Sequence, residues 1–176
     1  MENILSSEIV FTCPLFKVEY SKVELPNGTI EDRWYVIKND AVGIIAIDTS
    51  NNILLTREYR SASKEIRWRI PAGGLKDEEI PENGARRELR EETGYDSENI
   101  ELLFTKKIPS GWIKQSSHFF LAKNLFASPL KSNEYENIEI IPTSIDLAIQ
   151  KVKEGEIGGN IGEAILEAGR RLNMNK

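Results

Sequence analysis

The chain has 176 residues, a size that suits one domain with a small appendage. Hydrophobic residues make up 40% of it, enough for a buried core, and the single Cys13 excludes an internal disulfide or a cysteine zinc cluster. A formal net charge of −5 argues against a dedicated nucleic-acid binder, and neither a secretory signal nor a membrane-spanning apolar run is visible. These features predict a soluble, cytoplasmic protein built around one core.

Residues 1–39 predict a small antiparallel β-sheet. β-Branched and aromatic side chains dominate residues 8–25, and they return at Trp34–Ile37 after a break in the pattern. The break is Pro26-Asn27-Gly28, a typical turn sequence because proline presets φ and glycine accepts a positive φ. We therefore expect antiparallel strands on either side of this turn.

The next segment predicts buried strands followed by a basic stretch. The apolar run Val42–Ile47 is typical of a strand buried on both faces, and after a turn cluster a second strand begins at Ile53. Residues 57–69 carry five Lys or Arg against two Glu, which fits either a solvated hairpin or a segment that faces phosphate. We expect Pro71–Gly74 to be a loop.

A helix is expected at about residues 81–93. Pro81 suits the first turn of a helix, and Gly94 suits the position after its end. Two residues weaken this prediction: Gly84 lies inside the helix, and Ile80 stands where a polar cap would be expected.

The carboxyl-terminal part predicts two further strands and two further helices. The strands are expected at residues 100–108 and 118–125, with a loop between them. Ser144 or Thr143 can cap a helix that ends before Gly155, and a last helix follows at about residues 162–172. Strands with helices before and after them indicate a mixed α/β sandwich.

Three carboxylates share one face of the expected helix at 81–93. Glu88, Glu91 and Glu92 are spaced i, i+3 and i+4, which brings their Cβ atoms within about 5–6 Å of one another. Such a cluster is unfavourable by itself, but it makes sense around a hard cation such as Mg²⁺, with Arg87 as an ion-pair partner that orients Glu91. The alternative is a solvated acidic helix face, which most charge runs are.

The wider pattern decides between these two interpretations. The segment from Gly73 to Tyr95 fits G-x5-E-x7-R-E-U-x-E-E-x-G-U at every specified position, where U is bulky and apolar or Tyr. Seven positions demand a single residue type, so chance gives such a match about once in 10⁷ windows. The segment resembles the Nudix box of the Nudix hydrolases, which cleave nucleoside diphosphates linked to another moiety and hold Mg²⁺ or Mn²⁺ with this box.

The resemblance extends to the ADP-ribose pyrophosphatase branch of that family. Arg57-Glu58-Tyr59-Arg60 and Arg69-Ile70-Pro71-Ala72-Gly73 resemble the approach to the box in that branch. The resemblance implies a Nudix-type α/β/α sandwich with a mixed sheet over residues 40–176, preceded by the antiparallel sheet of residues 1–39. In that branch the amino-terminal sheet helps to form a homodimer, and both subunits build the substrate site.

The resemblance implies a metal site and a set of catalytic carboxylates. Glu88 and Glu92 would be the principal ligands of Mg²⁺ or Mn²⁺, with the carbonyl of Ala72 as a further ligand. Glu91 would join Glu88 and Glu92 as a catalytic carboxylate. A metal held in this way neutralises diphosphate charge and can activate water.

The resemblance also implies three substrate-binding residues. Arg60 would contact phosphate, Trp34 would stack on the base, and Gly73 would lie at the substrate. A guanidinium group matches phosphate oxygens and an indole face suits a purine, so the residue types agree with these roles.

The chain departs from the branch at three positions. The branch has Gln at position 58 and Glu at position 69, whereas this chain has Glu58 and Arg69. A Glu in the loop after the box, which acts as metal ligand or base in relatives, is replaced by Gln115, and an amide cannot be a general base. Lys114, beside Trp112, could bind a phosphate or a stacked ring.

Three explanations of Gln115 stay open at this point. The first is that another carboxylate acts as the general base, the second is that the activity is weak, and the third is that the substrate differs from that of the branch. The carboxylates that could take over are Glu88, Glu134, Glu136 and Glu139.

The sequence thus predicts a metal-dependent hydrolase that converts ADP-ribose to AMP and ribose 5-phosphate. GDP-mannose, ADP-glucose and dinucleoside polyphosphates are alternative substrates. A sensor domain that binds a nucleotide sugar with little turnover is the alternative of another class. The partners expected are a small nucleoside diphosphate and a second copy of the chain.

Overall fold

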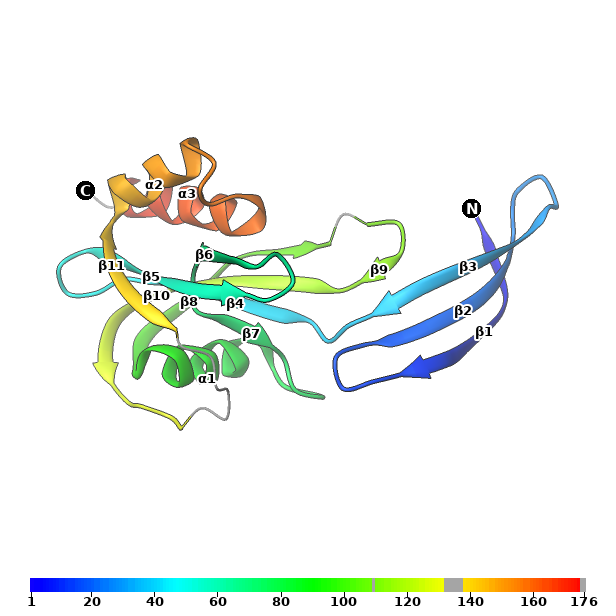
Figure 1. Ribbon diagram of the computed structural model, residues 1–176, viewed down its shortest axis with the longest axis horizontal. Helices are drawn as coiled ribbons and strands as arrows, with labels where there is room; N and C mark the ends of the chain where they lie inside the picture. The colour runs from blue at the N-terminus through cyan, green and yellow to red at the C-terminus, as the bar shows by residue number, and fades with distance from the viewer. Residues whose placement is uncertain (109, 132–137, 175–176) are drawn as a thin grey trace. The chain divides into compact units, whose positions relative to one another are not determined.

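The computed structural model describes residues 1–108, 110–131 and 138–174. They form two compact units (Figure 1). The first comprises Met1–Asp40 with Lys107–Ser117, and the second comprises Ala41–Lys106 with the residues from His118 onward. Lys107–Ser117 thus groups with the amino-terminal strands although it lies far from them in the sequence.

The first unit is a four-stranded sheet in the order β1-β2-β3-β9. Its strands are β1 (Asn3–Thr12), β2 (Lys17–Glu24), β3 (Ile30–Ile37) and β9 (Ile113–Lys114). The first three pair antiparallel as expected, and Gly28, with φ of 80°, closes the predicted turn between β2 and β3. β9 adds a parallel partner to β3, in a segment that the sequence had suggested to be a loop.

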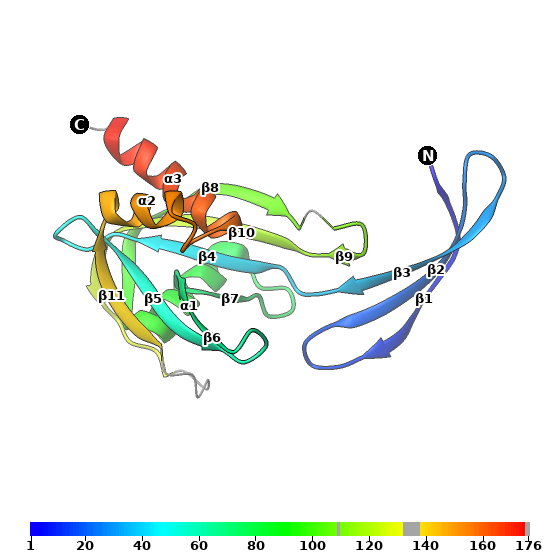
Figure 2. The same cartoon turned by 45° about the horizontal axis from the view of Figure 1, so that its top comes forward.

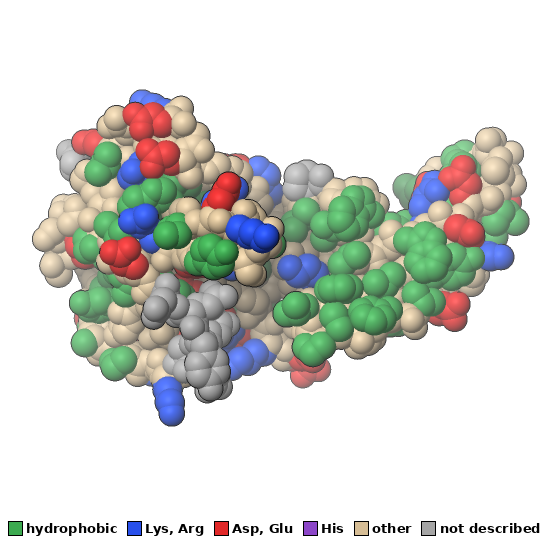
Figure 3. Space-filling model, in the orientation of Figure 1, with side chains coloured by type: hydrophobic (Ala, Val, Ile, Leu, Met, Phe, Trp, Pro, Cys, Tyr) green, Lys and Arg blue, Asp and Glu red, His purple; other side chains and the backbone are tan. Residues whose placement is uncertain are grey.

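Strand β1 is exposed along its whole length, and half of its residues are large and apolar. The space-filling view shows hydrophobic side chains gathered on the amino-terminal sheet (Figure 3). The exposed large apolar residues of β1 are Ile4, Leu5, Ile9, Val10 and Phe11. Exposed apolar patches of this kind mark interaction surfaces in soluble proteins.

The strands of the second unit form two sheets. The strands are β4 (Ala41–Ala46), β5 (Asn52–Arg60), β6 (Glu65–Arg69), β7 (Ala72–Gly74), β8 (Tyr95–Lys107), β10 (Ser116–Ala127) and β11 (Glu139–Ser144). The orders are β7-β4-β10-β8 and β11-β5-β6, and an Ile47–Ile53 bridge links β4 to β5. β7 replaces the expected loop because its backbone pairs with β4. β5 and β6 form the hairpin that the basic stretch suggested.

The helices of the described part of the chain are α1 (Pro81–Thr93), α2 (Ile145–Lys153) and α3 (Gly159–Met174). The prediction for α1 is confirmed, and Gly94 ends the helix with φ of 77°. Gly84 is explained by packing, since a Cβ there would lie 2.3 Å from Cδ2 of Leu75. Ser144 caps α2 by accepting a hydrogen bond from the Leu147 amide. In the described residues, no helix has the length and apolarity that crossing a membrane requires.

The helices cover both faces of the second unit's strands (Figure 2). Ala85 and Leu89 of α1 pack against Val42, Ile44 and Leu54 on one face. The opposite cluster joins α2 and α3 to the strands through residues that include Ile45, Leu55, Leu121, Ala148 and Ile165. Alternate residues of the apolar run in β4 therefore serve opposite clusters, which confirms the strand buried on both faces and the α/β/α arrangement.

Candidate active site

The carboxylates of α1 are organised by the Arg87 side chain. Glu88 is buried, with 5% of its surface exposed, and its Oε1 accepts a hydrogen bond from Nη1 of Arg87 at 2.5 Å. The same Nη1 donates to Oε2 of Glu91 at 3.0 Å. The predicted ion pair between Arg87 and Glu91 is thus confirmed, and Arg87 joins two carboxylates that would otherwise repel each other.

The rest of the Arg87 guanidinium holds the loop before α1. Nε and Nη2 donate to the two carboxylate oxygens of Glu79 at 2.9 and 2.8 Å, and Nη2 also donates to the Gly74 carbonyl at 2.9 Å. Glu79 in turn accepts a hydrogen bond from the Lys76 amide. This paired geometry suits guanidinium and carboxylate, and it fastens the turn between β7 and α1 to the helix.

The pKa of Glu79 follows from this geometry. Hydrogen bonds from Arg87 lower the pKa of this carboxyl to about 2, against the opposing effect of burial. The same hydrogen bond raises the pKa of Arg87 above its usual value. The pair therefore stays charged across the physiological pH range.

Two α1 carboxylates approach the backbone of β7. Oε2 of Glu92 accepts a hydrogen bond from the Ala72 amide at 3.3 Å. A Cβ at Gly73 would lie 2.2 Å from the carboxyl carbon of Glu88, so a residue with a side chain cannot occupy position 73 without moving Glu88. Glu88, Glu92 and the Ala72–Gly73 backbone are therefore brought together, and Gly73 is required for that close approach.

This donor set suits a hard divalent cation. Within the described residues, no three acidic, histidine or cysteine side chains are gathered as a metal centre. The predicted set does not need such a cluster, because it consists of two carboxylates and a backbone carbonyl, and Mg²⁺ completes its shell with water and substrate phosphates. The carboxylates of Glu79, Glu88, Glu91 and Glu92 carry four formal negative charges, and the Arg87 guanidinium offsets one of them. A bound cation would offset part of the remaining three.

A second charged cluster lies on the β5–β6 hairpin. The Glu58 side chain is 4% exposed and forms ion pairs with Arg60 and with Nε of Arg69, the latter at 3.7 Å. Thr56 donates a hydrogen bond to Oε1 of Glu58 at 3.2 Å. The sequence marked positions 58 and 69 as departures from the branch but did not pair them. The signal was present, because the two positions differ from the branch by complementary charges.

Strand alternation assigns this cluster to the α1 side of β5. Leu54 belongs to the core cluster of α1, and successive even positions of β5, including Glu58 and Arg60, point to that same face. Arg57 and Tyr59 point to the other face, where Leu55 belongs to the core cluster of α2 and α3. Arg60 therefore shares a face of the strands with the helix that carries the box.

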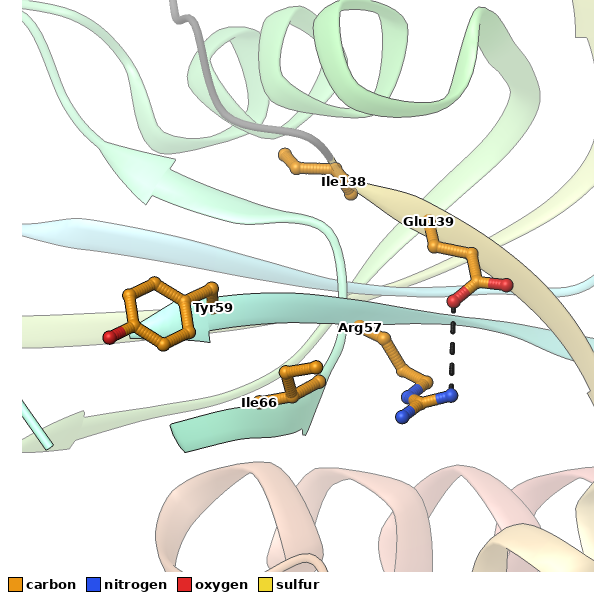
Figure 4. A pocket seen from close by; sticks show the side chains of 5 residues that line it. All are labelled: Arg57, Tyr59, Ile66, Ile138 and Glu139. Atoms are coloured by element: carbon orange, nitrogen blue, oxygen red, sulfur yellow. Dashed lines mark ion pairs between the residues drawn. The ribbon is translucent and has the colours of Figure 1, made fainter. Parts of the chain in front are cut away.

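Glu139 lies on the face of β5 away from α1. It is directly opposite Arg57 in the β11–β5 register, and the two side chains form an ion pair at 3.9 Å (Figure 4). They line a hollow of about 540 Å³ together with Tyr59, Ile66 and Ile138. The suggestion that Glu139 could replace the loop Glu is therefore wrong, because it points away from α1. Glu134 and Glu136 lie outside the described residues.

The remaining predicted residues belong to the first unit. Trp34 lies on β3 with 56% of its surface exposed, and its ring centroid is 4.9 Å from that of Tyr20. Lys114 forms an ion pair with Glu19 at 2.7 Å, so its charge is already compensated within this unit. Gln115 donates a hydrogen bond to the Asn39 carbonyl, a structural role that fits an amide.

The family of the chain is shown by comparison with known proteins. Residues 37–144 match the family model described as the NUDIX domain. The chain therefore belongs to the Nudix hydrolase family, as the pattern from Gly73 to Tyr95 predicted.

Individual relatives resemble the chain over most of its length. The methanol dehydrogenase activator of Bacillus methanolicus is 34% identical over 89% of this chain and 85% of its own length. The ADP-ribose pyrophosphatase of Bacillus subtilis (strain 168) is 29% identical over 89% of this chain and 85% of its own length. A crystal structure of an ADP compounds hydrolase superposes with a TM-score of 0.87 at 21% identity, covering 99% of this chain and 95% of the other, which confirms the fold.

The close approach at Gly73 gives a first prediction. We expect Gly73→Ala to displace the Glu88 carboxylate and to lower the affinity for Mn²⁺ by about tenfold or more, the size typical of a disturbed ligand environment. Calorimetric titration with Mn²⁺ measures this. Gly74→Ala is the matched control, since a Cβ there meets nothing within 4 Å and binding should be unchanged. Equal affinity in both variants would contradict the account.

The Glu79–Arg87 pair gives a second prediction. The pKa of the Glu79 carboxyl, near 2, lies below the usual value of 4.5. The contribution of the pair to folding stability is therefore complete above about pH 4.5 and disappears as the pH falls towards 2. At pH 7 the free energy of unfolding of Glu79→Gln should therefore be about 1–3 kcal/mol lower than that of wild type, so the variant should unfold at a lower urea concentration. The difference should shrink steadily below pH 4.5. Glu78→Gln, at an exposed neighbour, should follow wild type, and a pH-independent loss at position 79 would rule out the pair.

Proposed function

We propose that this protein hydrolyses the diphosphate bond of a nucleoside diphosphate sugar, with ADP-ribose as substrate and AMP and ribose 5-phosphate as products. The observation that carries the proposal is the approach of Glu88 and Glu92 to the Ala72–Gly73 backbone inside a complete Nudix box. A named ADP-ribose pyrophosphatase among the relatives supports the choice of substrate.

Each residue of the box has a defined task in this proposal. Glu88, Glu92 and the carbonyl of Ala72 would hold Mg²⁺ or Mn²⁺, which supplies charge neutralisation at the diphosphate and activation of the attacking water. Arg87 keeps Glu88 and Glu91 at fixed positions while Glu79 holds Arg87. The metal site is thus built on a helix rather than on a loop, which favours precise geometry.

Phosphate recognition and proton transfer fall to neighbouring groups. Arg60, on the α1 side of β5, offers a planar fork to phosphate oxygens. Because the Gln115 amide cannot take a proton, the attacking water loses its proton to a box carboxylate, Glu88 or Glu91. Among the carboxylates that could replace the loop Glu, Glu139 lies on the opposite face and Glu134 and Glu136 lie outside the described residues, so the choice of a box carboxylate is part of this proposal.

Hydrolysis is tested directly with Glu92→Gln, which keeps the shape of the side chain and removes its charge. Wild type with Mg²⁺ should release AMP from ADP-ribose, and the variant should be at least about a hundredfold slower, because the site loses a carboxylate at the reacting diphosphate. Chromatography of the products gives the rates. The control is Glu82→Gln, at an exposed position in the first turn of the same helix.

The outcomes of this experiment separate the alternatives. ADP-ribose that binds without turnover would support a sensor domain, which the Gln115 replacement favours. Faster release of product from GDP-mannose, ADP-glucose or a dinucleoside polyphosphate would retain the reaction and change the substrate. Full activity in Glu92→Gln would contradict the role of the box carboxylates.

A second candidate function comes from the relative named methanol dehydrogenase activator. In that case the chain would raise the rate of a partner dehydrogenase. Stimulation of a methanol dehydrogenase by wild type but not by Glu92→Gln would link activation to hydrolysis. Equal stimulation by both proteins would make binding of the partner sufficient.

We further propose a homodimer formed through the amino-terminal sheet, with Trp34 stacking on the substrate base. The support is the continuous exposure of β1 and its large apolar side chains. A monomer would leave these side chains in water, whereas a second copy would bury them. The exposed indole of Trp34 offers a face to a purine.

The dimer is tested by one charge on β1. Phe11→Glu should shift the protein from dimer to monomer in sedimentation velocity experiments, because a carboxylate buried at an apolar interface is unfavourable. Glu8→Gln, an exposed change on the same strand, should stay dimeric. A wild-type protein that sediments as a monomer at micromolar concentration would refute the dimer.

A further inference from the structure

The β5–β6 hairpin holds more positive charge than its buried carboxylate needs. Glu58 is 4% exposed, and a buried carboxylate is stable only when it is paired. One guanidinium would be enough to neutralise it, but both Arg60 and Arg69 pair with it. The formal charges of these three side chains thus sum to plus one, and the side chains of Arg60 and Arg69 are 38% and 32% exposed.

The excess charge is a property of this chain and not of the branch it resembles. With Gln at position 58, Arg at position 60 and Glu at position 69, as in the branch, the formal charges of the three side chains would sum to zero. Here Glu58, Arg60 and Arg69 sum to one positive charge. The exchange of position 69 from an acid to a base removes a negative charge from a diphosphate site and adds a positive one.

Arg69 is also close to the metal-binding segment. It is directly opposite Thr56 in the β5–β6 register, so it shares the α1 side of the hairpin with Glu58. Only Ile70 and Pro71 separate it from Ala72, which limits the distance between the Cα atoms of Arg69 and Ala72 to about 11 Å. A guanidinium at this position can reach a ligand that lies at the box.

Arg60 supplies an independent sign of a missing acceptor. Its Nε is buried and has no hydrogen-bond partner among the residues that the structure describes. A buried donor without an acceptor costs about 1–3 kcal/mol, so its persistence indicates that something else satisfies it. A phosphate oxygen is the acceptor that suits a guanidinium.

We propose that Arg69 is a second phosphate-binding residue of this site and that buried Glu58 is the positioning residue that holds Arg60 and Arg69 side by side. The inference rests on the proposed function in one respect, namely that the ligand is a nucleoside diphosphate. Two guanidinium groups of the hairpin then bind the diphosphate.

The test measures binding of ADP in the presence of Mg²⁺ by calorimetric titration. Arg69→Gln should weaken ADP binding at least tenfold, since one of the two charged contacts is lost. Arg67→Gln is the matched control, because Arg67 lies on the same strand, is 54% exposed and forms an ion pair with the exposed Glu65. Its ADP affinity should stay within twofold of wild type.

Glu58→Gln separates positioning from direct contact. Both guanidinium groups lose their shared anion, so KM for ADP-ribose should rise about tenfold while kcat changes less than threefold, because Glu58 does not touch the reacting atoms. If this variant fails to fold, Glu58→Gln combined with Arg69→Gln leaves a neutral pair in its place. The double variant should bind ADP more weakly than Arg69→Gln, because Arg60 has also lost its anchoring carboxylate, and equal binding would contradict the positioning role of Glu58.

The results distinguish this inference from the proposed function. ADP binding requires no turnover, so weakened binding in Arg69→Gln supports the inference even if no nucleotide sugar is hydrolysed. Unchanged ADP affinity in a folded Arg69→Gln protein overturns it, even if ADP-ribose is hydrolysed. Wild type that binds no ADP at millimolar concentration also overturns it.

Discussion

The candidate site depends on one guanidinium, that of Arg87. Its five hydrogen bonds reach three carboxylates and the Gly74 carbonyl, so a single side chain fixes the turn after β7, the first half of α1 and the carboxylates of the second half. Without that charge, the acidic face of α1 would repel itself and the loop would lose its attachment. With it, Glu88 is held close to the backbone of β7, where Glu92 accepts a hydrogen bond from the Ala72 amide.

Because side chains alternate along β5, its two Arg–Glu ion pairs lie on opposite faces of the strand. Arg57 and Glu139 pair on the face toward α2 and α3, and Glu58 with Arg60 pairs on the face toward α1. In sequence Arg57, Glu58 and Arg60 are neighbours within one basic stretch, yet only Glu58 and Arg60 share a face with the box. A one-residue shift of register would exchange the two sets, so the core contacts of Leu54 and Leu55 also determine which charges face the diphosphate.

Much of this arrangement could be predicted from the sequence where local chemistry decides it. Pro81 and Gly94 bound α1, and the spacing of Glu88, Glu91 and Glu92 predicts their shared face. The strand at Ala72–Gly74 could not be predicted, because its pairing with β4 is non-local and its residues have low strand propensity. The complementary charges at positions 58 and 69 hint at their pairing, but the pairing depends on the hairpin register, which no local pattern specifies.

The central claim is that an α1 braced by Arg87 presents Glu88, Glu92 and the Ala72 carbonyl to a divalent metal. The most direct measurement is a crystal structure grown with Mn²⁺, in which anomalous scattering locates the ion. We expect Mn²⁺ to be bound by Glu88, Glu92 and the carbonyl of Ala72, with Arg87 still paired to Glu79. An ion bound elsewhere, or none at α1 at saturating Mn²⁺, would contradict it.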